Sequence, residues 1–130
     1  MVMKTVVLLD SNLLFLPHRQ KIDVFSEIQD IVPETHEIVT LSTVVSELER
    51  LKEMKSEDGV AARIGLELLR RNNVRVIEAE GQADESIIKF ALENKRDVIV
   101  CTNDVRLKNQ LNKKGIQLIL MRSKNHLVRF

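Results

Sequence analysis

Short apolar runs alternate along this chain with segments in which apolar residues recur every three or four positions. Thr5–Leu9 and Val98–Cys101 consist almost wholly of apolar and β-branched residues, which is typical of strands buried on both faces of a parallel sheet. Three further runs rich in β-branched residues predict strands at Glu37–Leu41, Val74–Glu78 and Ile116–Met121. We therefore expect a five-stranded sheet.

The segments between these runs carry the period of helices. In residues 22–31, for example, apolar side chains recur at spacings of three. We expect a loop around Pro17, a helix end at Gly115, and a short edge strand at Leu127 and Val128. The predicted helices cover residues 22–31 and 59–72, follow a cap at Ser42 or Thr43, begin near Ala83, and follow a cap at Asn103.

Strands that alternate with helices predict an α/β fold with right-handed crossovers, a three-layer α/β/α sandwich around a parallel sheet. The 130 residues suit a single domain. No apolar run approaches the ~18 residues of a membrane span, and the N-terminus shows no signal-peptide pattern. The lone cysteine, Cys101, excludes a disulfide within the chain and is expected in the core. We therefore expect a soluble, cytoplasmic protein.

The charges are unevenly distributed, although the net charge is only +1. Residues 1–104 carry 13 Lys and Arg and all 19 Asp and Glu, whereas residues 105–130 carry seven Lys and Arg and no acid. An acidic body beside a basic segment can hold cations in one place and phosphates next to them. A solvated basic helix and tail is the alternative. Aromatic residues make up only 3% of the chain, which argues against single-strand binding by aromatic stacking.

Four consecutive strand–helix units each place one carboxylate near the end of a strand. Asp10 follows the first strand, Glu47 lies in the helix after the second, Asp84 opens the helix after the third, and Asp104 follows the fourth. Ligands of open parallel sheets bind outside the carboxyl ends of the strands. We therefore expect these four side chains at one edge of the sheet.

Most of these acids also have a purely structural explanation. Asp84 and Asp104 stand where helix caps and helix dipoles favour acids anyway. Glu47 shares its helix with Glu49, so either acid can face solvent. Asp10 is the exception, because an acid at the end of an apolar central strand is costly without a partner or an ion.

Converging carboxylates require a cation to offset their repulsion, and oxygen ligands favour Mg²⁺ or Mn²⁺. Such an ion can activate a water for attack on a phosphodiester. Other chemistries lack their motifs: there is no GxxxxGK[ST], no GxGxxG, no DxD after the first strand because position 12 is Asn, and no zinc-ligand spacing. The polar neighbours available to hold metal waters or the phosphate are Ser11, Asn12, Thr102 and Asn103.

Together these segments resemble the PIN-domain nucleases. The residues that carry the resemblance are 8–12 (LLDSN), 45–51 (VSELERL), 83–87 (ADESI), 100–108 (VCTNDVRLK) and 115–122 (GIQLILMR). The resemblance implies a sheet ordered 3-2-1-4-5, Mg²⁺ or Mn²⁺ dependence, RNA cleavage and a homodimer. It also implies metal ligation by Asp10, Glu47, Asp84 and Asp104, supported by Asn12 and by Thr102 or Asn103.

Within the family, the chain looks most like the single-domain archaeal type, which is related to VapBC-type toxins and to the endonuclease that matures small-subunit ribosomal RNA. An antitoxin or a ribosome-assembly partner is therefore implied. Two positions depart from the family pattern: Arg106 replaces a second acid after the fourth strand, and Glu85 replaces the second Asp of the common "ADD" segment.

The leading hypothesis from the sequence is a metal-dependent endoribonuclease with RNA phosphates bound by basic residues beside the acids. A nucleic-acid-binding scaffold with the same fold and weak turnover is the alternative. The residues expected to bind RNA are Arg106, Lys108, Lys113 and Lys114.

Overall fold

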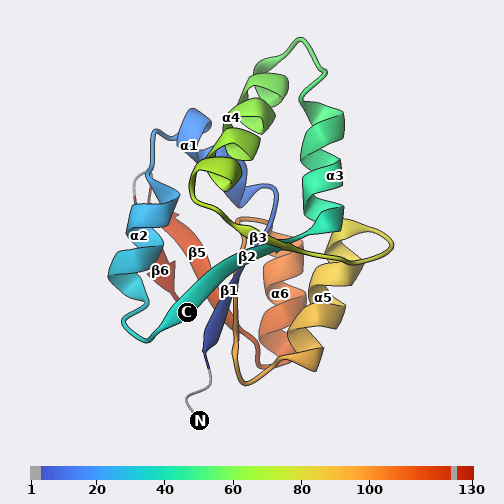
Figure 1. The fold of residues 1–130 in the computed structure, drawn as a ribbon. Coiled ribbons are helices and arrows are strands. Elements are labelled where there is room, and N and C mark those ends of the chain that lie inside the picture. Colours follow the sequence, from blue (N-terminus) through green and yellow to red (C-terminus); the bar gives the residue numbers. More distant parts are fainter. Residues whose placement is uncertain (1–3, 124–125) are drawn as a thin grey trace.

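The computed structural model describes residues 4–123 and 126–130, and the strands among them form one sheet (Figure 1). The strands are β1 (Thr5–Leu9), β2 (His36–Leu41), β3 (Arg75–Ile77), β4 (Val98–Cys101), β5 (Gln117–Ser123) and β6 (His126–Arg129). Their order is β3-β2-β1-β4-β5-β6. The first five are parallel, and β6 runs antiparallel to β5. The order 3-2-1-4-5 is therefore confirmed, and the predicted edge strand makes the sheet six-stranded.

Helices cover both faces of this sheet (Figure 1). The connections β1–β2 and β2–β3 step in one direction along the sheet, whereas β3–β4 and β4–β5 step in the other, so right-handed crossovers put their helices on opposite faces. The predicted three-layer α/β/α sandwich is confirmed. The first face carries η1 (Leu13–Phe15), α1 (Leu16–Arg19), α2 (Val24–Ile31), α3 (Ser42–Leu51) and α4 (Glu57–Arg71), and the second carries α5 (Ala83–Glu93) and α6 (Val105–Lys113).

Strands β1 and β4 lie side by side in the middle of the sheet and are its most buried strands. Val7, Leu8, Leu9 and all of Val98–Cys101 have no exposed surface, as expected for strands covered on both faces. Leu9 pairs with Cys101, so the two strands end at the same level. The residues that follow them are therefore neighbours at the carboxyl edge of the sheet.

The sequence misplaced several local features. The expected loop around Pro17 is instead helical, because Pro17 stands in the first turn of α1, where its missing N–H costs nothing. Ser42 does not cap α3: its hydroxyl donates to the Ala79 carbonyl (3.1 Å) and accepts the Ala79 N–H (2.9 Å). Gly115 does end the last helix, at φ +75°. The other predicted boundaries differ from the observed ones by one or two residues.

No helix within residues 4–123 and 126–130 has the length and apolar character needed to span a membrane.

Close packing between α4 and η1 fixes the segment that follows β1. A Cβ added at Gly65 in α4 would lie 3.0 Å from the Leu14 carbonyl oxygen and 3.2 Å from Leu14 Cβ. Glycine is therefore needed here for the close approach of two backbones. Because η1 begins three residues after Asp10, this contact helps to set the position of the carboxyl edge.

We predict that Gly65→Ala lowers the free energy of unfolding by about 1–2 kcal/mol. Overpacking costs about 1–3 kcal/mol, and this outweighs the gain of about 1 kcal/mol in helix propensity. Chemical denaturation followed by circular dichroism measures the difference. A variant more stable than the wild type would show that helix propensity prevails and that the contact is not tight.

Candidate active site

Asp10 is a buried carboxylate at the end of β1, with 3% of its surface exposed. Its backbone N–H continues the sheet by donating to the Cys101 carbonyl at 3.0 Å. Its Oδ1 accepts the Ser11 N–H at 2.7 Å, and its Oδ2 accepts the Thr102 hydroxyl at 2.7 Å. The carboxylate is thus held from both central strands.

The segment after β4 is tied to the segment after β1 by a small network of hydrogen bonds. Asn12 Oδ1 accepts the Asn103 N–H at 3.0 Å, and Thr102 Oγ1 accepts the Asp104 N–H at 3.1 Å. Asp104 Oδ1 in turn accepts the Leu107 N–H at 3.1 Å and caps α6. The predicted cap at Asn103 is therefore wrong by one residue, because Asp104 takes that position.

Glu47, rather than Glu49, faces this network. The Ser11 hydroxyl donates to Glu47 Oε1 at 3.2 Å, which joins α3 to the end of β1. Glu49 instead forms an ion pair with Lys52 on another surface of the helix. The sequence left this choice open, and the orientation of α3 decides it.

Asp84 enters from α5, whose first turn is held to the first turn of α3. The Thr43 and Ser86 hydroxyls are 2.7 Å apart, and Ser86 also donates to the Ala83 carbonyl. Glu85 lines the same cavity as Asp84. The charge of Asp84 acts on the buried Asp10, so Asp84 is the better-placed acid.

The four acids line one cavity of about 640 Å³ at the carboxyl edge of the sheet. The structure therefore brings together all four carboxylates that the sequence singled out, together with Ser11, Asn12 and Glu85. Arg50, Gln110 and Ile88 also line it and were not predicted. Helical spacing was the available signal, because Arg50 follows Glu47 by three positions and Gln110 follows Arg106 by four.

This cavity carries an excess of negative charge, because five acids and two arginines line it. The pKa of Asp10 is raised to about 6, mainly because the carboxyl group is buried. The charges of Asp84 and Glu47 also raise it, whereas hydrogen bonds from Thr102 and Ser11 act in the opposite direction. Partial burial and the charge of Asp104 also raise the pKa of Asp84, against the opposing effect of Arg106. A cation bound among these carboxylates would relieve both effects.

The donor chemistry of the cavity fits a hard divalent cation, since every candidate ligand is an oxygen. In residues 4–123 and 126–130, no group of three or more acidic, histidine or cysteine side chains lies close enough together to hold a metal ion. Mg²⁺ keeps several waters and commonly uses only one or two carboxylates. The carboxylates therefore suit an ion that is held partly through water.

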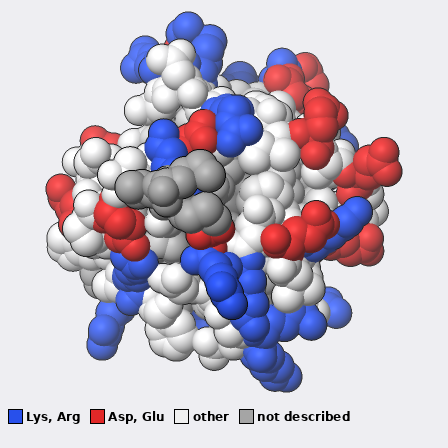
Figure 2. Space-filling view, turned by 60° about the horizontal axis from the view of Figure 1, so that its bottom comes forward, with Lys and Arg blue, Asp and Glu red and all other residues white. Residues whose placement is uncertain are grey.

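The predicted RNA-binding residues are not all placed beside the acids. Arg106 lines the cavity. Lys108 lies on the other flank of α6, with its Nζ 5.9 Å from the centre of the Phe130 ring. Lys113 and Lys114 lie at the far end of α6, toward the bottom of Figure 1. The face that comes forward there carries many Lys and Arg side chains (Figure 2). The structure thus brings only Arg106 of the four to the cavity.

Burial of the Asp10 charge is expected to cost stability in the metal-free protein. Between its usual pKa of 3.8 and its folded pKa of about 6, the folded state binds more protons than the unfolded state, so stability falls as pH rises through this range. About two pKa units correspond to about 3 kcal/mol at most.

We predict that Asp10→Asn raises the free energy of unfolding at neutral pH by about 1–3 kcal/mol in the presence of a chelator. The amide oxygen of the new Asn still accepts the hydrogen bond from the Ser11 N–H, and its NH2 group donates to the Thr102 hydroxyl. That hydroxyl can then donate to Asn12 Oδ1, 3.4 Å away. Urea denaturation near pH 7 and near pH 4 measures the effect, and the gain should nearly vanish at the lower pH. A variant less stable than the wild type near pH 7 would contradict the prediction.

Comparison with known proteins identifies the family. Residues 7–124 match the family described as "PIN like domain". Ribonuclease VapC4 of Methanocaldococcus jannaschii is 34% identical over 121 residues, which cover 90% of each chain. The solved structure of the PIN domain endonuclease Utp24 superposes with a TM-score of 0.76 at 23% identity, over 95% of this chain and 90% of that one. A domain of a functionally unknown protein from Methanocaldococcus jannaschii superposes with a TM-score of 0.64 at 21% identity, over 92% of each chain.

At such identities the two solved structures show a shared fold and nothing more. The family match over most of the chain and the curated relative go further, and they bear out the resemblance seen in the sequence. This chain belongs to the PIN-like domain family.

Proposed function

We propose that this chain is a single-domain, metal-dependent endoribonuclease that hydrolyses RNA phosphodiester bonds. The observation that carries the proposal is the buried Asp10 carboxylate in the wall of a cavity that three further acids line. Its relative named as a ribonuclease supports RNA as the substrate. In this proposal Asp10, Glu47, Asp84 and Asp104 are the catalytic, metal-holding residues, with Glu85 in support.

Mg²⁺ or Mn²⁺ bound by these carboxylates would activate a water and stabilise the negative charge that develops on the phosphate. The chain's own contribution is to hold the carboxylates in place before the substrate arrives. Asp10 is fixed by Thr102 and Ser11. Ser11 also fixes Glu47, so one residue orients two of the four acids.

Asn12 is placed to hold the scissile phosphate or a water beside it. Its Oδ1 is occupied by the Asn103 N–H, so its amide N–H groups remain for donation, and the residue lines the cavity. Arg106 supplies a positive charge to the same cavity from the first turn of α6. Together they can orient a phosphodiester against the acids.

Arg106 also motivates the alternative, a nucleic-acid-binding scaffold with little turnover. A positive charge where relatives carry an acid reduces the number of metal ligands and increases the attraction for phosphate. Metal binding separates the two functions, because the scaffold requires no metal.

The partners follow from the family resemblance alone. We propose a cytoplasmic homodimer, which light scattering of the purified protein tests, and either an antitoxin or a ribosome-assembly protein as partner. The relative named VapC4 supports the toxin-type role, and a toxin is encoded beside a small antitoxin. The neighbouring gene therefore distinguishes the toxin from a ribosomal RNA processing enzyme.

We predict that Asp10→Asn and Glu47→Gln each lower the rate of RNA cleavage in Mn²⁺ or Mg²⁺ by about 100-fold or more, because each removes a carboxylate from the metal-holding set. Glu49→Gln is the matched control: it lies in the same helix, changes the charge equally and pairs with Lys52 away from the cavity. Its rate should stay close to that of the wild type. Cleavage of a labelled RNA followed on a denaturing gel measures all three.

Thermal unfolding with and without Mn²⁺ completes this experiment. Mn²⁺ should raise the melting temperature of the wild type and of Glu49→Gln, since a ligand that binds only the folded state stabilises it. It should not raise that of Asp10→Asn. Cleavage by Asp10→Asn at the wild-type rate would refute the nuclease, and an absence of Mn²⁺ stabilisation in the wild type would favour the scaffold.

A further inference from the structure

Helices α5 and α6 lie side by side on the second face of the sheet (Figure 1). Residues near the start of each helix line the acid cavity. Asp84 and Ile88 line the cavity from α5, and Arg106 and Gln110 line it from α6. Their far ends meet again at the opposite edge of the sheet. There, a Cβ added at Gly115 would lie 3.4 Å from both Cε and Nζ of Lys95.

The buried residues of each helix show which flank faces the other helix. On α6, Leu107 and Leu111 face the core, so Arg106, Gln110 and Lys113 share one flank. This is the flank toward α5, because Arg106 and Gln110 line the shared cavity.

The matching flank of α5 is identified in the same way. Ile87 and Ala91 face the core, and Asp84 and Ile88 share the flank toward α6. Lys95, in the turn that follows α5, lies beside Gly115 at the end of α6. Leu92, one turn after Ile88, is 45% exposed. We call the surface formed by Ile88, Leu92, Lys95, Arg106, Gln110 and Lys113 the α5–α6 strip.

The strip leads to a cluster of exposed cations. Lys95 and Arg96 lie in the turn after α5, Lys113 is the last residue of α6 and Lys114 follows it, and all four are exposed. Within the described part of the chain, none of them forms an ion pair. In Figure 2, which brings this end of the molecule forward, Lys and Arg side chains gather on the lower part of the face.

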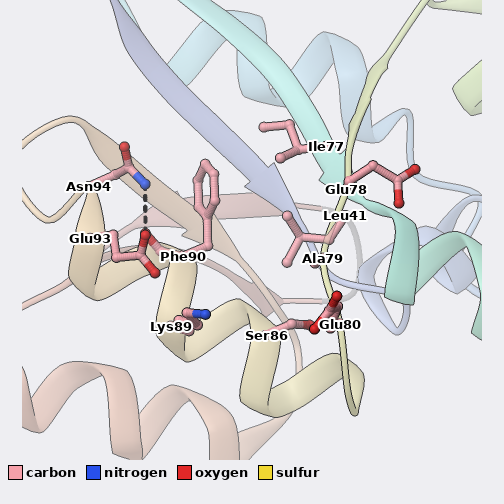
Figure 3. A pocket seen from close by; sticks show the side chains of 10 residues that line it. All are labelled: Leu41, Ile77, Glu78, Ala79, Glu80, Ser86, Lys89, Phe90, Glu93 and Asn94. Carbon is pink, nitrogen blue, oxygen red and sulfur yellow. Dashed lines mark hydrogen bonds between the residues drawn. The ribbon is translucent and has the colours of Figure 1, made fainter.

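The other flank of α5 has the opposite character. Ser86, Lys89, Phe90 and Glu93 line a separate cavity of about 590 Å³ against β2 and β3 (Figure 3). Its lining includes three glutamates and one lysine, so it repels phosphates. A polyanion that starts at the acid cavity is therefore attracted along the α6 side of α5 and not along this side. The three glutamates are Glu78, Glu80 and Glu93.

We propose that a single RNA strand runs along the α5–α6 strip, from the acid cavity to the cations at the opposite edge of the sheet. The proposal rests on the proposed function, which places the scissile phosphate at the acids. Lys113 follows Arg106 by seven positions in α6, a rise of about 10 Å. A strand that rises about 3.4 Å per nucleotide covers this distance in about three nucleotides.

The apolar part of the strip argues for a single strand. Ile88 and Leu92 lie between Arg106 and the terminal cations, where unpaired bases can pack on them while phosphates contact the cations. A duplex keeps its bases stacked inside and presents phosphates and sugars, so it gains nothing from these side chains. The chain's scarcity of aromatic residues means that aliphatic side chains take this role.

The test compares charge reversal on the two flanks of α6. Lys113→Glu and Lys95→Glu alter the strip, and Lys108→Glu is the matched control, since Lys108 lies on the same helix but beside Phe130. Each is combined with Asp10→Asn to prevent cleavage, and binding of a labelled RNA of about 12 nucleotides is measured by fluorescence anisotropy. We expect about tenfold weaker binding for both strip variants, with a shallower dependence on salt. The control and the parent protein should bind alike.

Three results would overturn the proposed RNA path along the strip. They are equally weakened RNA binding by Lys108→Glu, unchanged RNA binding by Lys113→Glu, or tighter binding of the same RNA annealed to its complement. Cleavage assays with Asp10 intact separate this outcome from failure of the nuclease. In those assays the strip variants should lose efficiency on the RNA of about 12 nucleotides relative to a dinucleotide, which has one nucleotide beyond the scissile phosphate and is too short to reach Lys113. If the wild type cleaves neither RNA but RNA binding still depends on Lys95 and Lys113, the proposed RNA path is supported and the proposed hydrolysis is refuted.

Discussion

The site depends on a carboxylate buried where the two central strands of the sheet end. Asp10 has almost no exposed surface, and its oxygens are held by the Ser11 N–H and the Thr102 hydroxyl. This is possible because β1 and β4 end in register, Leu9 beside Cys101. A shift of one residue between the strands would turn Thr102 away from Asp10. The apolar runs that specify the two strands therefore also specify the geometry of the charged site between them.

The chain holds the other three acids with uncharged groups rather than with cations. Ser11 orients Glu47, the hydroxyls of Thr43 and Ser86 join the helices that carry Glu47 and Asp84, and Asp104 is oriented by the backbone of α6. Strong ion pairs are found elsewhere, on exposed surfaces where they contribute little to stability. The negative charge of the cavity is thus left for a ligand to neutralise. Without that ligand the charge lowers the stability of the fold, as functional sites commonly do. The exposed pairs include Arg75 with Glu37, Arg129 with Glu34 and Arg70 with Glu67.

Much of this could be predicted from the sequence, because periodicity and strand ends depend on local patterns. The strands, the α/β class and the four acids at one edge all followed from such patterns. The strand order came only from the family resemblance. Local patterns do not show which partner a hydroxyl binds. Ser42 was therefore one of the two residues predicted to cap α3, although it is hydrogen-bonded to Ala79 in another segment. Nor did they distinguish Glu47 from Glu49, since both are acids on one helix and only its packing shows which faces Asp10.

The basic residues show a further limit of reasoning from composition. The excess of positive charge after Asp104 suggested one basic face beside the acids, but α6 divides it between two flanks and two ends. Lysines at the end of a helix also have a simpler explanation, because they interact favourably with the helix dipole. The helix dipole favours any lysine near the last turn, on whichever flank of the helix it lies. Lys95 lies beside Gly115 at the end of α6, and Lys113 shares a flank of α6 with Arg106, which lines the acid cavity at the opposite end of the two helices. This shared orientation is what a path for a polyanion requires and what the dipole does not explain.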